Sequence, residues 1–287
     1  MVLPTGRCAT ATRVIKSGTS FGRHWTVLAP DLPFVSWILV GLFVALVAFL
    51  GIRAQRKDRR EYQRFKRYHS TVRRQGMYRK WLRESFLAFG GLSLVLLALV
   101  WQFVPLLLEE INGWDGVRSA RAWYASLGGF SIALAVAVGF VIIVVPILVL
   151  FLARSQEDVT AIGDIQALIP RNTAEVRLGA LLSLNAGVVE ELLFRLAVPA
   201  LLYGAFGSAM FALITSALLF GALHAYQGAA GIAGTTVVGA FLLLLYVATG
   251  SIIVPIVVHV LIDLRSFVLI PLIVLRVQRV SSPAPDS

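Results

Sequence analysis

Acidic residues and cysteine are scarce in this chain. Its 287 residues include 15 Asp and Glu against 26 Lys and Arg, and Cys8 is the single cysteine. One cysteine excludes an internal disulfide and a thiolate metal cluster. Cys8 also lies far along the sequence from every polar group inside an apolar segment, which argues against a cysteine nucleophile.

The sequence also lacks a phosphate-binding glycine loop and any recognised nucleic-acid module. Its glycine cluster at Gly228, Gly231, Gly234 and Gly239 lies within an apolar stretch, which is typical of close helix packing. Basic residues beside apolar segments meet anionic lipid headgroups first. We therefore expect the lipid bilayer as a partner and no nucleic acid.

Charge of either sign is sparse as well. Charged residues make up 14% of the chain and hydrophobic residues 58%, which excludes an ordinary soluble domain and a disordered chain. Because about 20 apolar residues cross a bilayer as a helix, we predict an all-α, polytopic membrane helical bundle of about seven transmembrane helices. The predicted spans are 33–52, 86–108, 123–153, 178–203, 208–226, 228–249 and 251–275.

The positions of the basic residues predict the orientation. Half of the 26 lie between Arg53 and Arg83, and basic loops favour the cytoplasm. We expect an integral protein of a bacterial-type cell membrane, with its N-terminus outside and its C-terminus cytoplasmic. The predicted parts are a basic tail (1–32), three spans with a basic cytoplasmic loop at 53–85 (33–177), a four-helix membrane core (178–275) and a C-terminal tail (276–287).

The basic loop itself has two interpretations. Tyr62, Phe65 and Tyr68 recur at helical spacing among the arginines, which suits a helix lying on anionic lipid. A solvated basic connector between the first two spans fits the sequence equally well.

Polar residues inside the predicted spans are the strongest functional signal. Glu190, Glu191 and Arg195 lie in a run of otherwise almost uncharged residues, and a charge at the bilayer centre costs roughly 2.5–3.5 kcal/mol. Glu191 and Arg195 are four residues apart and can pair, which leaves Glu190 about 100° round the helix and able to face another partner.

Two further spans carry histidines. His224 follows Phe220 by four residues, and Asp263 follows His259 by four, so Asp263 can orient His259. Because lipid rejects such groups, we expect all three spans to direct them into one internal cavity with water.

The chemistry of such a cavity has two forms. A carboxylate can take a proton from water while histidines position the water or stabilise an oxyanion, which suits amide hydrolysis. Alternatively, Glu190, His224 and His259 could hold a zinc ion with an open coordination position. The sequence does not separate the two.

Three motifs carry a family resemblance. EELLFR (Glu190–Arg195), FGALH (Phe220–His224) and HVLID (His259–Asp263) resemble, in order, the EExxxR, FxxxH and HxxxN/D motifs of the CPBP intramembrane proteases. That family includes the CAAX prenyl endopeptidases and the Abi proteins associated with bacteriocin self-immunity. The resemblance implies an intramembrane endopeptidase, glutamate-dependent or metal-dependent, that acts on a membrane-associated and in some members prenylated protein or peptide.

The resemblance also implies a role for each motif residue. Glu190 would be the general base, His224 would position the same water, and Glu191 with Arg195 would hold Glu190 in place. His259 and Asp263 would stabilise the oxyanion. Members of the prenyl endopeptidase branch often have asparagine where this chain has Asp263, and an ionised carboxylate would repel an oxyanion, so we interpret Asp263 as an orienting partner of His259.

Alternatives stay open at this point. A non-catalytic immunity or scaffold protein of the same family would use the same bundle, and buried acids and histidines also form proton paths in small transporters. The predicted boundaries place His224 nearer the cytoplasm than Glu190 and His259, and a genuine difference in depth would argue against one shared site. Asn185 and Arg265 are assigned to packing or to the cavity wall, and Phe220 to packing.

Overall fold

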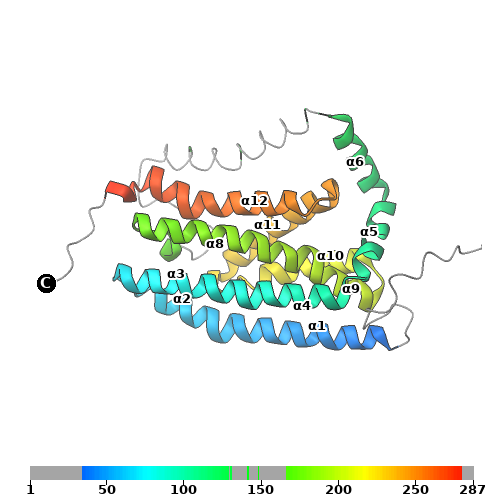
Figure 1. Cartoon of the computed structure of the whole chain (residues 1–287), viewed down its shortest axis with the longest axis horizontal. Coiled ribbons are helices and arrows are strands. Elements are labelled where there is room, and N and C mark those ends of the chain that lie inside the picture. Colours follow the sequence, from blue (N-terminus) through cyan, green and yellow to red (C-terminus); the bar gives the residue numbers. More distant parts are fainter. Residues whose placement is uncertain (1–33, 129, 131–140, 142–147, 149–165, 280–287) are drawn as a thin grey trace, which may run out of the picture.

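The fold is a bundle of helices, as predicted. The computed structural model of the chain describes residues 34–128, 130, 141, 148 and 166–279, and no strand occurs among them. Figure 1 shows long helices running side by side, with α5 and α6 crossing one end of the bundle. The predicted all-α membrane bundle is confirmed.

The helices have the following bounds. In chain order they are α1 (Val35–Ile52), α2 (Arg59–Phe65), α3 (Thr71–Ser85), α4 (Gly91–Val100), α5 (Phe103–Gly113), α6 (Asp115–Ser126), α8 (Thr173–Glu191), α9 (Val198–Phe206), α10 (Ala209–Ala222), α11 (Gly228–Thr249) and α12 (Ile253–Leu264). Wider π-helical turns continue four of them: η1 (Arg53–Asp58), η2 (Phe86–Gly90), η5 (Leu192–Ala197) and η7 (Arg265–Val274). Short 3₁₀ turns are η4 (Gln166–Leu168), η6 (Ala225–Gln227) and η8 (Val277–Arg279).

Four helices in the described part of the chain are long and apolar enough to cross a membrane. They are Val35–Phe65, Thr71–Val100, Ala225–Thr249 and Ile253–Val274, with Ala209–Ala222 as a shorter apolar helix. The continuous helix Thr173–Phe206 contains the predicted fourth span and carries the three charged residues of EELLFR. Most of the predicted third span, 123–153, lies outside the described residues, so the count of seven stays a prediction.

The basic segment 53–85 is helical, as the spacing of its aromatic residues predicts. α1 continues through η1 into α2, and α3 returns antiparallel to it, as Figure 1 shows. Tyr62 and Phe65 are buried rather than turned toward lipid. Phe65 packs against Trp81 with ring centroids 4.8 Å apart, and Lys80 binds Glu61 at 2.5 Å. The aromatic spacing therefore reflects a folded hairpin.

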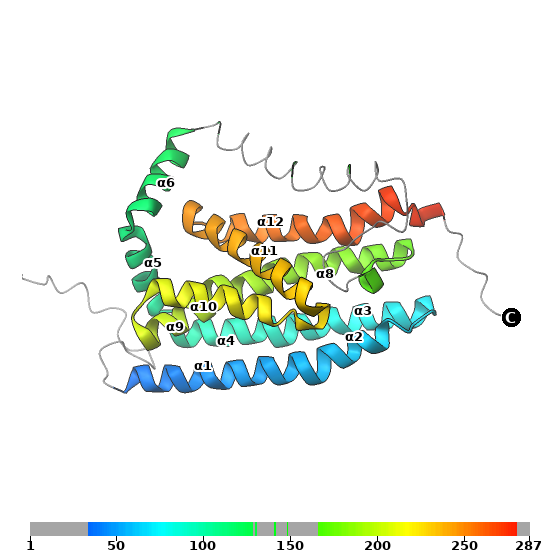
Figure 2. The ribbon, with the colours of Figure 1, turned by 180° about the vertical axis from the view of Figure 1, so that it is seen from behind.

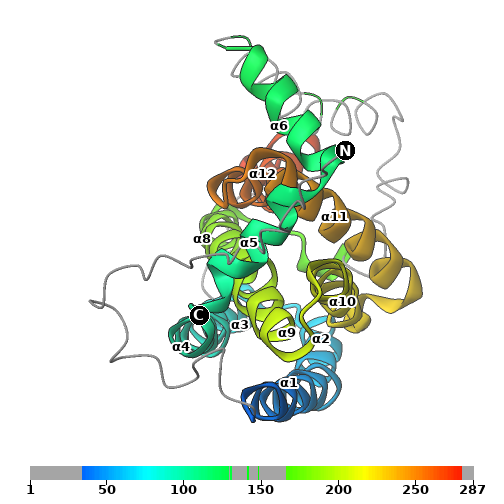
Figure 3. The same ribbon diagram turned by 90° about the vertical axis from the view of Figure 1, so that its right-hand side faces the viewer.

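The α8–η5–α9 helix occupies the middle of the bundle. Viewed end on, α9 is surrounded by α1, α4, α5 and α10 (Figure 3). Leu201 and Leu202 of α9 are fully buried, and a Cβ at Gly204 would meet Leu39 of α1 and Phe103 of α5. The main apolar core thus encloses the helix that carries the two glutamates.

Small residues bring α12 against α8. Gly179, Ser183 and Gly187 are buried at four-residue intervals along α8, a pattern that lets helix backbones approach closely. A Cβ at Gly187 would lie 3.1 Å from the backbone nitrogen of Val260 and 3.3 Å from the carbonyl of Ile256. This close approach places His259, the neighbour of Val260, beside the end of α8.

Candidate active site

The helix that bears the glutamates is fixed at its start. Asn172 is the N-cap of α8, and its side-chain oxygen accepts the Glu175 N–H at 2.9 Å, while Glu175 accepts the backbone N–H of Arg171 at 3.0 Å. This is an arrangement close to a capping box, which satisfies donors that a helix start leaves free.

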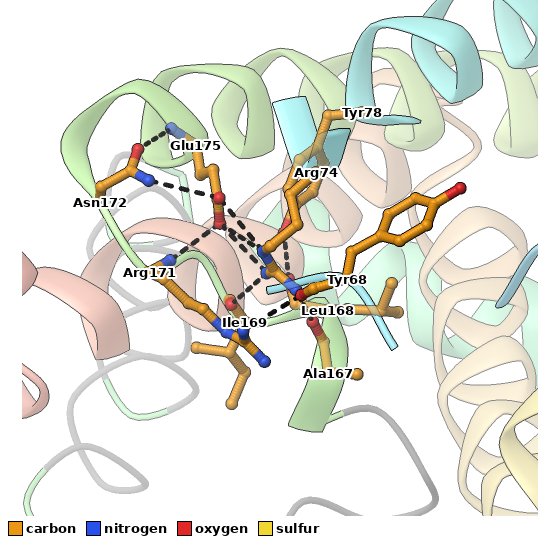
Figure 4. A network of polar contacts seen from close by, with 9 residues as sticks. All are labelled: Tyr68, Arg74, Tyr78, Ala167, Leu168, Ile169, Arg171, Asn172 and Glu175. Carbon is orange, nitrogen blue, oxygen red and sulfur yellow. Dashed lines mark hydrogen bonds and ion pairs between the residues drawn. The ribbon is translucent and has the colours of Figure 1, made fainter. Parts of the chain in front are cut away.

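A buried arginine completes this anchor (Figure 4). The Nε of Arg74, on α3, lies 3.1 Å from both Glu175 oxygens, and its two terminal nitrogens donate to the carbonyls of Ala167 and Ile169 at 3.0 and 3.1 Å. Tyr78 donates to the carbonyl of Leu168. Both members of the Arg74–Glu175 pair are fully buried, so this pairing sets the position of α8 relative to α3.

Glu191, the last residue of α8, binds two partners. One oxygen accepts a hydrogen bond from His259 Nδ1 at 2.9 Å, and the other lies 3.1 Å from Arg195 Nε. The Arg195 contact is an ion pair whose N–H is not aligned for a hydrogen bond. The predicted Glu191–Arg195 pair is therefore present, and the Glu191–His259 hydrogen bond joins α12 to the central helix.

The other nitrogen of His259 faces two more carboxylates. His259 Nε2 is 4.0 Å from Glu190 and 4.0 Å from Asp263. Gaps of this length are too long for direct hydrogen bonds and suit a bridging water or a substrate oxygen. Because Nδ1 donates to Glu191, Nε2 carries a proton only when the ring is an imidazolium.

One expectation about these residues changes and another holds. The partner that orients His259 is Glu191, from another helix, rather than Asp263 one turn along its own helix. Glu190 faces a partner other than Arg195, as predicted, because it approaches the other nitrogen of the His259 imidazole. Helical spacing showed which residues share a face but gave no information on which neighbouring helix faces them.

His224 joins the site through Phe220. The two rings lie 4.9 Å apart, and the Phe220 ring is 6.1 Å from that of His259. The Arg195 guanidinium lies 5.2 Å over the same ring, so Phe220 packs at the centre of the site. His224 Nδ1 donates to the Phe220 carbonyl at 2.9 Å, which leaves Nε2 of the neutral ring as an acceptor.

The apparent difference in depth is thereby resolved. α10 is short, and the 3₁₀ turn η6 that follows it packs against η1 and α2, partway along the bundle rather than at its basic end (Figure 2). The basic helices α2 and α3 extend the bundle beyond the predicted end of the first span. His224 therefore lies at the same depth in the bundle as Glu190 and His259.

Exposure divides the site into two groups. The side chains of Glu191, Arg195 and His259 are 0%, 1% and 7% exposed, whereas those of Glu190 and Asp263 are 21% and 27% exposed. His224 is half-buried too. Glu190, His224 and Asp263 can therefore reach water, while the other three form the buried support behind them.

A metal ion is the other chemistry considered for these side chains. Within the described part of the chain, no group of three His, Cys, Asp or Glu side chains is arranged to hold a metal ion. Glu190, His224 and His259 are therefore not gathered as a metal-binding group in this arrangement, and a zinc ion stays a prediction. We derive no step through a metal.

One polar residue at the site was not assigned from sequence. Tyr226, whose ring is 6.0 Å from that of His224, had no motif to mark it beyond its place two residues after the histidine. Asn185 donates to Ser85 at 2.9 Å, which agrees with its assignment to packing. Arg195 also donates to the Gly239 carbonyl at 3.2 Å, and its Nη1 is buried without a hydrogen-bond partner among the described residues.

Residues 172–265 match the protein-family model Rce1-like, described as type II CAAX prenyl endopeptidase Rce1-like. This segment resembles the Rce1-like family. The match confirms the resemblance to CPBP and CAAX proteases that the three motifs predicted, and it supports a hydrolase of the CAAX protease type. The Rce1-like segment begins at the N-cap of α8 and contains all six predicted site residues.

Comparison with curated proteins gives no match, and neither does comparison with solved structures. The Rce1-like segment and the apolar helices together identify an integral membrane protein.

Proposed function

We propose that the protein is an intramembrane endopeptidase that hydrolyses a peptide bond of a membrane-associated, prenylated CAAX-type substrate with water activated by Glu190. The observation that carries this proposal is the placement of His259 between two glutamates. One glutamate is buried and bonded to the imidazole, and the other is accessible and 4.0 Å away.

Glu190 is the base in this mechanism. Its carboxylate accepts a proton from a water held by Nε2 of His224, and the resulting hydroxide attacks the carbonyl carbon of the scissile amide. Glu191 is excluded from this role by its burial and its two partners. It acts as a positioning residue that holds the His259 ring.

The oxyanion that forms on the scissile carbonyl is stabilised by His259. An imidazolium His259 keeps a proton on Nε2, stabilised by the Glu191 carboxylate at Nδ1, and donates it as a hydrogen bond to the developing negative charge. Glu190 then returns its proton to the leaving nitrogen as the C–N bond breaks, which yields a new carboxylate and a free amine. The proton that Glu190 takes from the water is therefore the proton that it gives to the leaving amine.

The test is cleavage of a farnesylated CAAX-type peptide by purified protein in lipid nanodiscs. Glu190→Gln keeps the size of the side chain and removes the base, so we expect a loss of about 10²–10⁴-fold in kcat. Glu109→Gln is the matched control, because Glu109 is exposed on α5 at the end of the bundle away from the basic hairpin.

A strong zinc chelator distinguishes the two chemistries. Turnover that persists with chelator and is lost in Glu190→Gln supports glutamate-activated water. Loss with chelator in the wild type would instead require a metal. Equal turnover by wild type and Glu190→Gln would overturn the assignment of Glu190, and no cleavage of any peptide would favour a non-catalytic immunity or scaffold role.

A further inference from the structure

A basic pocket lies beside the site on the side of the helical hairpin. It has a volume of about 540 Å³ and is lined by Arg56, Arg59 and Arg60 from the continuation of α1, and by Ala225 and Tyr226 from the turn after α10. Figure 2 shows this turn, between α10 and α11, next to the junction of α1 and α2. Gln55 and Ala54 complete the lining, so no acidic side chain is present.

These three arginines differ from the other charged residues of the hairpin. Lys57 pairs with Glu61 and Glu84, and Arg53 pairs with Asp58. Arg56, Arg59 and Arg60 are exposed and make no ion pair with any residue that the structure describes. The acidic residues of the hairpin therefore pair with Arg53 and Lys57 and not with these arginines. The pocket presents three guanidinium groups whose charge no carboxylate in the described part of the chain neutralises.

Tyr226 connects the pocket to the site. It lines the pocket, its ring is 6.0 Å from the ring of His224, and its hydroxyl accepts a hydrogen bond from Gln227 at 3.0 Å. Tyr62 of α2 packs edge-on against it at 5.5 Å. Tyr226 therefore borders both the site and the arginine pocket.

We propose that this pocket binds the C-terminal carboxylate of the substrate. The inference rests on the proposed endopeptidase function. A CAAX sequence ends three residues after its prenylated cysteine, and three extended residues span about 10 Å, enough to pass one aromatic ring. Guanidinium groups bind carboxylates through paired hydrogen bonds, which gives both orientation and affinity. The pocket would then select chain ends over internal sequences.

The experiment compares a farnesylated peptide that ends in a free carboxylate with the same peptide ending in an amide. For the wild type we expect the amide to have a KM at least tenfold higher with a similar kcat. The triple variant R56Q/R59Q/R60Q should raise the KM of the acid to that of the amide and leave the amide unchanged. R73Q/R79Q/R83Q removes the same charge from exposed arginines of α3 that line neither this pocket nor the adjoining one, and should keep the preference.

Binding provides a readout that does not depend on turnover. Labelled acid and amide peptides are titrated against the Glu190→Gln protein in nanodiscs, and the acid should bind at least tenfold more tightly. Equal binding and equal KM for the two peptides would overturn this proposal, while cleavage of neither peptide together with preferential binding of the acid would overturn only the proposed chemistry.

A change of lipid composition tests whether the pocket binds anionic lipid headgroups instead of the substrate carboxylate. The comparison is repeated in nanodiscs of phosphatidylcholine alone and with added phosphatidylglycerol. An effect of the triple variant that is equal for both peptides, and present only with the anionic lipid, would assign the pocket to lipid headgroups and contradict the carboxylate proposal.

Discussion

Glu191 uses both of its carboxylate oxygens in the buried part of the site. One contacts His259 and the other Arg195, and all three side chains are shielded from solvent. A buried charge that loses its partner is strongly destabilising, whereas an apolar replacement of both partners is often tolerated. We therefore assign Glu191 and Arg195 to positioning His259 and not to proton transfer.

A double-mutant cycle tests this assignment at the residue scale. Arg195→Met leaves Glu191 buried with one partner fewer, and we expect a loss of about 3–5 kcal/mol in unfolding free energy. The double variant E191Q/R195M should recover most of this loss while staying impaired in cleavage, because the amide still accepts a hydrogen bond from His259 but no longer stabilises its imidazolium form. Thermal unfolding in detergent and kcat measure the two effects.

Arg118→Met provides the comparison for an exposed pair. Arg118 contacts Asp115 on the surface, with 60% and 90% of the two side chains exposed, and such pairs contribute about 0–1 kcal/mol. An Arg195→Met protein as stable as Arg118→Met would show that the buried pair is not structural.

At the scale of the element, α8 is fixed at both ends. Its first turn is bonded to Arg74 and to the segment 167–171, and its last turns lie against α12 at Gly187. Between them the helix carries Glu190 and Glu191 to mid-bundle. The π-helical turn η5 follows at once, and such turns are frequent at functional sites.

Gly187→Ala tests the contact between α8 and α12. The added methyl group would overlap the Val260 side chain and press on the backbone of α12, so we expect a loss of about 1–3 kcal/mol. Cleavage should fall further than stability suggests, because a shift of α12 moves His259 away from Glu190. Thermal unfolding and kcat are measured together.

Gly41→Ala is the matched control for that variant. Gly41 lies within α1, and a Cβ there meets nothing within 4 Å. The change should be neutral or stabilise the helix by about 0.5–1 kcal/mol. Equal thermal stability and equal kcat of Gly187→Ala and Gly41→Ala would contradict the close approach of α8 and α12.

At the scale of the whole molecule, the two ends of the bundle differ in charge. The basic hairpin of α2 and α3, the start of α8 and the end of η7 lie at one end, and the α9–α10 and α11–α12 turns lie at the other (Figure 1). Because basic residues favour the cytoplasmic side, we expect the hairpin end to face the cytoplasm.

Labelling of single cysteines tests this orientation. In a Cys8→Ser background, Ser70→Cys, between α2 and α3, should react with a membrane-impermeant maleimide only from the cytoplasmic side. Ser251→Cys, in the turn before α12, should react only from the outside. Labelling of Ser70→Cys from outside intact cells would reverse the predicted topology.

The sequence was sufficient for the fold class and for a set of polar residues that the structure brings together, whose catalytic roles stay predictions. Long apolar runs require helices in a bilayer, because a lipid environment leaves backbone polar groups no other partner. Charged and imidazole side chains inside such runs stand out against that background, so Glu190, Glu191, Arg195, His224 and His259 were found without a structure.

Only the tertiary structure decided which residues meet. The partner of His259 is Glu191 and not Asp263, because the approach of α12 to α8 depends on glycines and on packing between distant segments. The helical hairpin at 53–85 and its pocket beside Tyr226 were hidden for the same reason. Helical periodicity reports the faces of one helix, whereas the contacts between helices arise from the shapes of all of them together.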